Sequence, residues 1–285
     1  MESRVGVFEK TSVGKALLAT QENEWQPAGT ILPMNLTDLK WTEVAALDRN
    51  TPVVVPVAAL EQHGHHLPLF TDSLLLGEVL KRAVGRVRGP VLVSPLTWLG
   101  NSEHHLDFPG TLSATPRVYL DLINGLAENF LVHGFKRIIF LNGHGGNDVP
   151  GKQALFEVRQ RHRKRGDLLL LFATYWHLAP QAKDCFPGLK QHEMGHACEW
   201  ETSMILRLSP QLVGSIIDIK PVEFGTAFEP ASRAWITQER TVPGHIGFPH
   251  LASEAKGEAL FEAFAAASGR FLQRVVDWDG VSWNG

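Results

Sequence analysis

The sequence has few cysteines, no excess of positive charge and no long uninterrupted apolar run. Its two cysteines are too few for a disulfide framework or a thiolate zinc site. The 27 basic and 30 acidic residues give a net charge of −3, which argues against a general nucleic-acid or membrane-surface binder. No stretch approaches the ~20 apolar residues of a membrane helix, and the first thirty residues lack a signal-peptide pattern. We therefore expect a cytoplasmic protein with neither a nucleic-acid nor a membrane partner.

The length, composition and hydrophobic patterning of the chain predict its domain organisation. The 285 residues are 44% apolar and 20% charged, as in an ordinary globular chain. Residues 1–45 are weakly patterned, and we interpret them as an N-terminal extension. Beyond them we find no internal repeat and no convincing linker, and residues 210–250, with many Pro and Gly, indicate a long excursion. We therefore expect a single domain over residues 46–285.

Short apolar runs alternate with helical segments along most of this domain. The runs are typical of strands buried on both faces and lie at residues 52–59, 91–93, 137–141 and 168–172. Helical periodicity follows Asp72, resumes after a cap at Ser113 or Thr115, and covers residues 149–164 and 253–276. Strands alternating with helices predict an α/β fold in three layers, with a mainly parallel sheet between helices.

Histidine is the unusually frequent residue, with 13 copies. Nine of them follow the four predicted strands, at positions 63, 65, 66, 104, 105, 144, 177, 192 and 196. Ligands of open α/β sheets bind beyond the carboxyl ends of the strands, so these loops are expected to meet at one edge. Each loop also brings Asp, Glu or Asn. Mixed imidazole and carboxylate groups without thiolate suit zinc, manganese or iron, so the pattern predicts a metal or acid/base site.

Two spacings favour particular ligands. Glu61 and His63 are two residues apart, so their side chains would share one side of an extended strand end. Asp72 begins the next helix and can place its carboxylate over the same edge, and a single Asp can bridge two metals. Glycines flank His144 in NGHGGN and allow a close approach of backbone to substrate or metal. Their spacing matches no phosphate-binding fingerprint.

Five motifs resemble those of the creatininase family. They are PVAALEQHGHHLPLFTD, GNSEHHLDFPGTLS, FLNGHGGN, HACEWETS and GHIGFPHLASEAKGE, which cover about residues 50–275 in order and spacing. The resemblance implies a three-layer α/β/α fold, a dinuclear metal centre and hydrolysis of non-peptide carbon–nitrogen bonds, often in cyclic amides. It also implies a small-molecule amide substrate and a homo-oligomer, commonly a hexamer.

The resemblance also implies the ligands, residue by residue. Glu61 and His144 would hold one divalent metal, His63 would hold the second, and Asp72 would bridge both. The fifth ligand of the family falls at residue 146, which is Gly here, so Glu201 in the ETS motif is our candidate replacement and thereby part of the catalytic set. His196 matches the acid/base proposed for the family.

Substrate contacts are expected from the loops beside these ligands. Ser102, Glu103 and His104 lie on the neighbouring loop, and we add Gly145 and His192 to this set. Two departures point away from creatinine as the substrate. Residue 146 is Gly where creatininase itself has a Glu ligand, and residue 192 is His where creatininase has a Trp.

The predicted reaction is hydrolysis of a non-peptide amide, cyclic or formyl. Two divalent ions (zinc, manganese or iron) would lower the pKa of a bridging water towards neutrality, and the hydroxide would attack the carbonyl. His196 would pass a proton to the leaving nitrogen. The NGHGGN motif is also similar to family members that cleave a formamide or trim a cofactor-precursor peptide. Ring-opening, isomerase or lyase chemistry and a non-catalytic metal-binding scaffold stay open.

Overall fold

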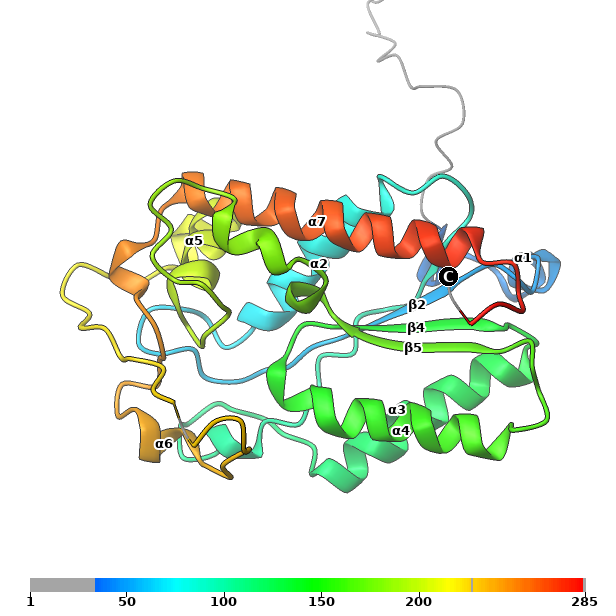
Figure 1. The fold of residues 1–285 in the computed structure, drawn as a ribbon, viewed down its shortest axis with the longest axis horizontal. Helices are drawn as coiled ribbons and strands as arrows, with labels where there is room; N and C mark the ends of the chain where they lie inside the picture. The colour runs from blue at the N-terminus through cyan, green and yellow to red at the C-terminus, as the bar shows by residue number, and fades with distance from the viewer. Residues whose placement is uncertain (1–33, 227, 284–285) are drawn as a thin grey trace, which may run out of the picture.

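The computed structural model describes residues 34–226 and 228–283, which form a five-stranded sheet between two layers of helices (Figure 1). The strands lie in the order β1-β3-β2-β4-β5, and each neighbouring pair is parallel. They are β1 Met34–Asn35, β2 Val53–Val57, β3 Leu92–Val93, β4 Arg137–Asn142 and β5 Leu169–Thr174. The expected three-layer α/β architecture is confirmed.

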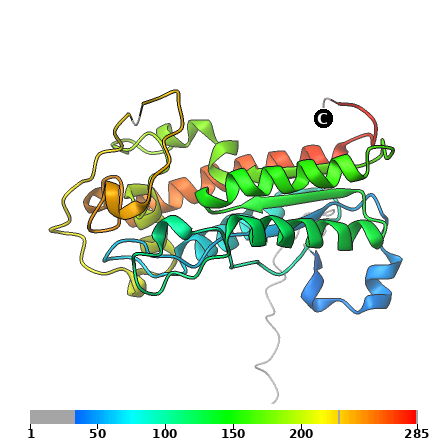
Figure 2. The ribbon, with the colours of Figure 1, turned by 90° about the horizontal axis from the view of Figure 1, so that it is seen from below.

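The helices divide between the two faces of this sheet. The long helices α2, α5 and α7 lie on one face, and α3 and α4 lie on the other (Figures 1 and 2). The bounds are α1 Trp41–Ala46, α2 Thr71–Val84, α3 Pro116–Val132, α4 Asp148–Arg161, α5 Glu199–Leu208, α6 Thr237–Arg240 and α7 Glu254–Asp277. The predicted helices after Asp72 and at 149–164 and 253–276 correspond to α2, α4 and α7. Thr115 is the cap of α3, since its hydroxyl oxygen accepts a hydrogen bond from the Val118 N–H at 3.4 Å.

Alternating side chains of the central strands enter two separate apolar cores. Val54 and Ile139 pack in the core beneath α2, α5 and α7, whereas Val53 and Ile138 pack in the core beneath α3 and α4. Successive residues of a strand point to opposite faces, so a strand covered on both sides is apolar at every position. Packing on both faces fixes the positions of the strands. The loops at their carboxyl ends therefore start from fixed points.

Two weakly patterned segments contact this framework. Within the predicted extension, Met34 N–H donates to the Val91 carbonyl at 3.1 Å and thereby adds β1 to the sheet, while residues 1–33 lie outside the described residues. Within the 210–250 excursion, Ile246 and His196 exchange backbone hydrogen bonds of 2.7 and 3.0 Å. Cys185 and Cys198 form no disulfide. No helix of the described residues has the length and apolar character to cross a membrane.

Candidate active site

Side chains from three segments of the chain converge at the carboxyl edge of the sheet. Glu61 and His63 follow β2, His144 follows β4, and Asp72 and Glu201 lie in the first turns of α2 and α5. All five side chains are buried, with 0–5% of their surface exposed. The structure therefore brings together all five residues expected as metal ligands.

Asp72 occupies the centre of this cluster. One of its carboxylate oxygens, Oδ1, lies 3.1 Å from His63 Nε2, and the other, Oδ2, lies 3.1 Å from His144 Nδ1. The first turn of α2 thus directs one carboxylate between imidazoles that come from two different strand ends.

Glu61 and Glu201 flank Asp72 on opposite sides. Glu61 Oε1 lies 3.3 Å from both His144 Nδ1 and His105 Nε2. Glu201 Oε1 lies 3.7 Å from His63 Nε2. The donor atoms therefore form two groups around Asp72, one with Glu61 and His144 and the other with His63 and Glu201.

The electrostatics of the cluster follow from burial opposed by close partners. Burial alone would lower the pKa of His63 and His144, but the neighbouring carboxylates raise both, that of His144 to about 10. Burial acts to raise the pKa of Glu61, but His144 and His105 hold it well below its usual value. Burial raises the pKa of Glu201, against the opposing effect of His63. Protons on two imidazoles thus balance the buried carboxylates, and divalent cations would replace these protons on binding.

Three carboxylate oxygens show that these residues fit a divalent metal. Glu61 Oε2, Asp72 Oδ2 and Glu201 Oε2 are buried and accept no hydrogen bond, although Asp72 Oδ2 is near a His144 nitrogen in an unfavourable orientation. A buried carboxylate oxygen is costly unless it is paired or coordinates a cation. Carboxylate oxygens and imidazole nitrogens of the cluster lie within 4.8 Å of one another in several sets of three, one of which is Glu61, His63 and Asp72. This donor chemistry suits zinc or manganese.

The ring of His196 lies against the cluster. It packs 4.4 Å from the His63 ring and 4.3 Å from the His105 ring, centroid to centroid. Its Nε2 lies 2.8 Å from the Gln62 carbonyl oxygen, and its Nδ1 lies 3.7 Å from Glu61 Oε1. Burial, reinforced by His63 and His105, lowers the pKa of His196 well below its usual value. This imidazole is therefore neutral near pH 7.

The asparagines of the NGHGGN motif hold three loops together. Asn147 donates to the Ala58 carbonyl at 2.9 Å, and its Oδ1 accepts from the Asn101 N–H at 2.8 Å. Asn142 donates to the His144 carbonyl at 2.6 Å, and its Oδ1 accepts from the His144 N–H at 3.1 Å. The two carboxamides therefore fix the His144 backbone relative to the strand that carries Glu61.

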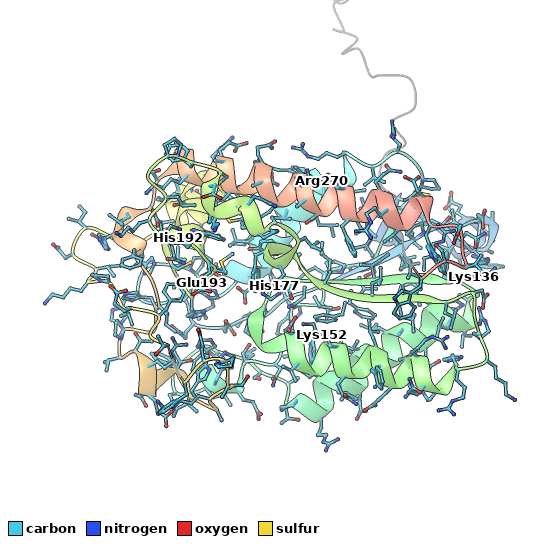
Figure 3. The ribbon with its side chains drawn as sticks, in the orientation of Figure 1. Lys136, Lys152, His177, His192, Glu193 and Arg270 are labelled. Atoms are coloured by element: carbon cyan, nitrogen blue, oxygen red, sulfur yellow. The ribbon has the colours of Figure 1, made fainter. Side chains whose placement is uncertain are left out.

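Only some of the residues expected to bind substrate lie beside the cluster. Ser102 is buried with its hydroxyl 3.3 Å from His144 Nε2, and the His104 ring stacks 5.8 Å from the His144 ring. Glu103, Gly145 and His192 are exposed. Figure 3 shows His192 on the segment that leads into α5. Substrate contacts by these three residues stay predictions.

The sequence reasoning gave no role to His105 or Gln62, which lie inside the site. His105 Nδ1 lies 2.9 Å from Gln62 Nε2 and 2.8 Å from the Thr237 hydroxyl. Because an amide nitrogen can only donate, Nδ1 is the acceptor of this ring. The proton of the neutral imidazole is therefore on Nε2, which faces Glu61. Burial lowers the pKa of His105 to about 3, which keeps the ring neutral. The sequence shows two adjacent histidines, His104 and His105. Only the one-turn 3-10 helix Glu103–His105 determines which of the two is buried.

Comparison with known proteins gives the family. A profile described as "Creatininase: Creatinine amidohydrolase" matches residues 37–272. The chain belongs to the creatininase family.

Curated creatininase-family relatives are similar over most of their length. Creatinine amidohydrolase of Pseudomonas putida is 29% identical over 245 residues, which cover 79% of this chain and 90% of the relative. Mycofactocin precursor peptide peptidase of Mycolicibacterium smegmatis is 30% identical over 217 residues, which cover 73% and 79%.

Solved creatininase structures share the fold. A manganese form (26% identity) and a mutant of the Zn–Zn type (27%) each give a TM-score of 0.72 and cover 85% of this chain and 98% of the other. A mutant complexed with creatine matches with the same score and coverage at 27% identity. With the buried ligand cluster, these findings make this chain a metal-dependent amidohydrolase that binds a divalent metal.

Gly146 lies where the structure leaves no space for a side chain. A Cβ at Gly146 would collide with the Asn101 carbonyl oxygen and lie 2.5 Å from His144 Nε2 and 3.0 Å from His104 Cε1. The loop that carries His104 therefore occupies the space that a ligand side chain at 146 would need.

We predict that Gly146→Ala destabilises the metal-free protein by about 1–3 kcal/mol, because overpacking forces the Asn101 loop away from His144. Gly145→Ala is the matched control, since a Cβ there meets nothing within 4 Å. It should change the free energy of unfolding by less than about 0.5 kcal/mol. Urea unfolding of both variants measures the difference. Equal stability of the two would contradict the close approach.

Proposed function

We propose that this enzyme hydrolyses a non-peptide amide bond at a centre of two divalent metal ions. The observation that carries the proposal is the carboxylate of Asp72, whose two oxygens each face an imidazole from a different loop at 3.1 Å. A carboxylate so placed is suited to bridge two cations, as two-metal hydrolytic sites require.

The two groups of donors supply the remaining ligands. Glu61 and His144 would hold one metal, and His63 and Glu201 would hold the other. Glu201 takes the role that a Glu at residue 146 has in creatininase, and its buried Oε2 without a hydrogen bond supports this assignment. Zinc and manganese, present in the creatininase structures, are the metals we propose.

When bound, divalent metals lower the pKa of a water and polarise a carbonyl oxygen. The protein supplies the rest. Neutral His196, held through Nε2 by the Gln62 loop, would accept a proton and deliver it to the leaving nitrogen. Ser102 and His104, beside His144, would orient the amide.

We infer that the substrate is not creatinine itself. The His104 loop fills the space beside Gly146, so no ligand side chain of the kind expected for creatininase fits there. Cyclic amides and formamides are the classes we propose. A precursor peptide is the second candidate, supported by the 30% identity to the mycobacterial peptidase.

We also propose that the enzyme is a homo-oligomer, a hexamer by family resemblance. Apolar side chains on α1, α3 and α4 support the proposal, since Trp41, Val132, Val149 and Phe156 are 63–81% exposed. Exposed apolar side chains that gather in one contiguous patch commonly mark protein–protein contacts.

The test of the proposed function is a screen of the metal-loaded protein against cyclic amides, formamides and short peptides, with detection of ammonia, formate and amines. At least one non-peptide amide should be cleaved, a chelator should abolish cleavage, and Mn²⁺ or Zn²⁺ should restore it. In ¹⁸O-labelled water the label should enter the carboxylate product. Turnover without label would indicate ring-opening or isomerase chemistry, and cleavage of peptides alone would favour the second candidate.

Asp72→Asn should remove both metals, because the amide keeps the shape but loses the charge that the two cations share. Elemental analysis should fall from two metals per chain to fewer than about 0.2, with loss of activity. Asp148→Asn is the matched control, since Asp148 begins α4 and bonds the Thr174 hydroxyl outside the cluster. Two metals per chain in Asp72→Asn would refute the bridging role.

His196→Gln should keep the metals and lose turnover. General acid–base catalysis typically contributes about 10²–10⁴-fold, so kcat should fall by that factor while KM changes little. His177→Gln, at an exposed histidine, provides the comparison. Loss of metal from His196→Gln would instead make His196 a ligand.

A further inference from the structure

The 210–250 excursion is attached directly to the residues that line the site. Gln62 Nε2 donates to the Gly244 carbonyl at 2.8 Å, and the Thr237 hydroxyl lies 2.8 Å from His105 Nδ1. The short helix α6, which begins at Thr237, therefore lies beside the Glu103–His105 turn, as Figure 1 also shows. Side chains around α6 have a fixed position relative to the cluster.

Trp235 extends the site outwards from His104. The half-buried indole meets the His104 ring edge-on, with the centroids 5.1 Å apart. His104 in turn stacks on His144, so the three rings form a continuous wall from a proposed metal ligand to the rim.

Arg240 spans the rim between two loops of the site. Its guanidinium carbon lies 4.9 Å from the centroid of the Trp235 ring, and its Nη2 donates to the Phe224 carbonyl at 2.7 Å. The Phe224 ring lies against Gly195, where a Cβ would be 3.0 Å from the ring's Cζ. Gly195 precedes His196, so Arg240 links the side of the site formed by His104 to the side formed by His196.

The Arg240 guanidinium has no carboxylate partner among the described residues. Arg82, Arg161 and Arg165, by contrast, each form an ion pair with a Glu or Asp. Arg240 is partly buried, and burial lowers its pKa. A guanidinium fixed by an indole face and one carbonyl keeps most of its five N–H donors available, in the planar fork that matches a carboxylate.

We propose that Trp235 and Arg240 form a substrate-binding subsite that stacks a planar group and binds a carboxylate on it. The proposal rests on the proposed function and narrows its substrate class to planar amides that carry a carboxylate. A carboxylate is favoured over a phosphate dianion, because the Arg240 guanidinium offers one positive charge beside a cluster with three carboxylates. The indole supplies a flat apolar surface, and the guanidinium fixes the orientation of the amide towards the metal ligands.

Two probes that differ only in the carboxylate test this subsite. They are 2-formamidobenzoate and formanilide, hydrolysed by the metal-loaded full chain. The wild type should prefer 2-formamidobenzoate in kcat/KM. Arg240→Gln should raise the KM for 2-formamidobenzoate about ten- to hundredfold, because this is the factor in affinity that a hydrogen bond to a charged group contributes. The kcat for 2-formamidobenzoate should change little, and the kinetics with formanilide should not change. Trp235→Ala should raise KM for both probes, and Trp235→Phe should restore most of the loss.

The matched control is Arg233→Gln, which removes the same charge from an exposed position on the same segment. Arg240→Lys keeps the positive charge and should retain part of the preference, which separates charge recognition from a folding defect. Equal effects of Arg233→Gln and Arg240→Gln, or equal loss on both probes in Arg240→Gln, would overturn the proposal.

A binding measurement distinguishes failure of this subsite from failure of the proposed function. The fluorescence of 2-aminobenzoate follows its binding without turnover, with aniline and phenyl phosphate as competitors. Arg240→Gln should weaken 2-aminobenzoate about tenfold or more, and aniline should compete poorly. If this dependence is found but no amide is cleaved, the proposed function fails and the subsite stands. Absence of binding, binding independent of Arg240, or preference for phenyl phosphate would refute the carboxylate subsite.

Discussion

The burial of three carboxylates within a few ångströms of one another is the constraint on which the site depends. Asp72, at its centre, is compensated by imidazoles on both of its oxygens. Buried charges of one sign are tolerated only with paired protons or cations. This requirement accounts for the concentration of histidines at one sheet edge, and for a site that would be electrostatically unfavourable without either protons or metal.

The ligands hold their positions because uncharged carboxamides organise the loops around them. Asn147 bonds the end of β2 to the Asn101 loop, and Gln62 bonds His105 and Gly244. This framework also explains why residue 146 is Gly. A loop drawn close by Asn147 leaves no space for a Cβ there, whereas Glu201, the proposed ligand from the ETS motif, lies 3.7 Å from His63.

The 210–250 excursion contributes side chains at the outer edge of the site that are not part of the sheet framework. The fold recurs in the creatininase structures, with a TM-score of 0.72 over 98% of one such chain. Recognition of a particular amide falls to the segments that extend beyond the sheet edge. In this chain those segments contribute the indole of Trp235 and the guanidinium of Arg240, which has no carboxylate partner within the part of the chain that the structure describes. The proposed subsite would favour a flat, negatively charged substrate over a neutral one.

The sequence by itself determined the three-layer α/β fold, because continuous apolar runs and helical periodicity are local properties that burial on two faces imposes. It also predicted that histidines and carboxylates gather at one sheet edge, since strand-end loops of a parallel sheet must meet there. The resemblance to the creatininase family, rather than the pattern itself, singled out the proposed ligands Glu61, His63, Asp72 and His144, with Glu201 as the candidate fifth. The choice between His104 and His105 as the neighbour of Glu61, the surface position of His192, and the approach of Trp235 and Arg240 were decided only by tertiary structure. They depend on the turn of a single 3-10 helix and on contacts between residues more than a hundred positions apart, which no local pattern records.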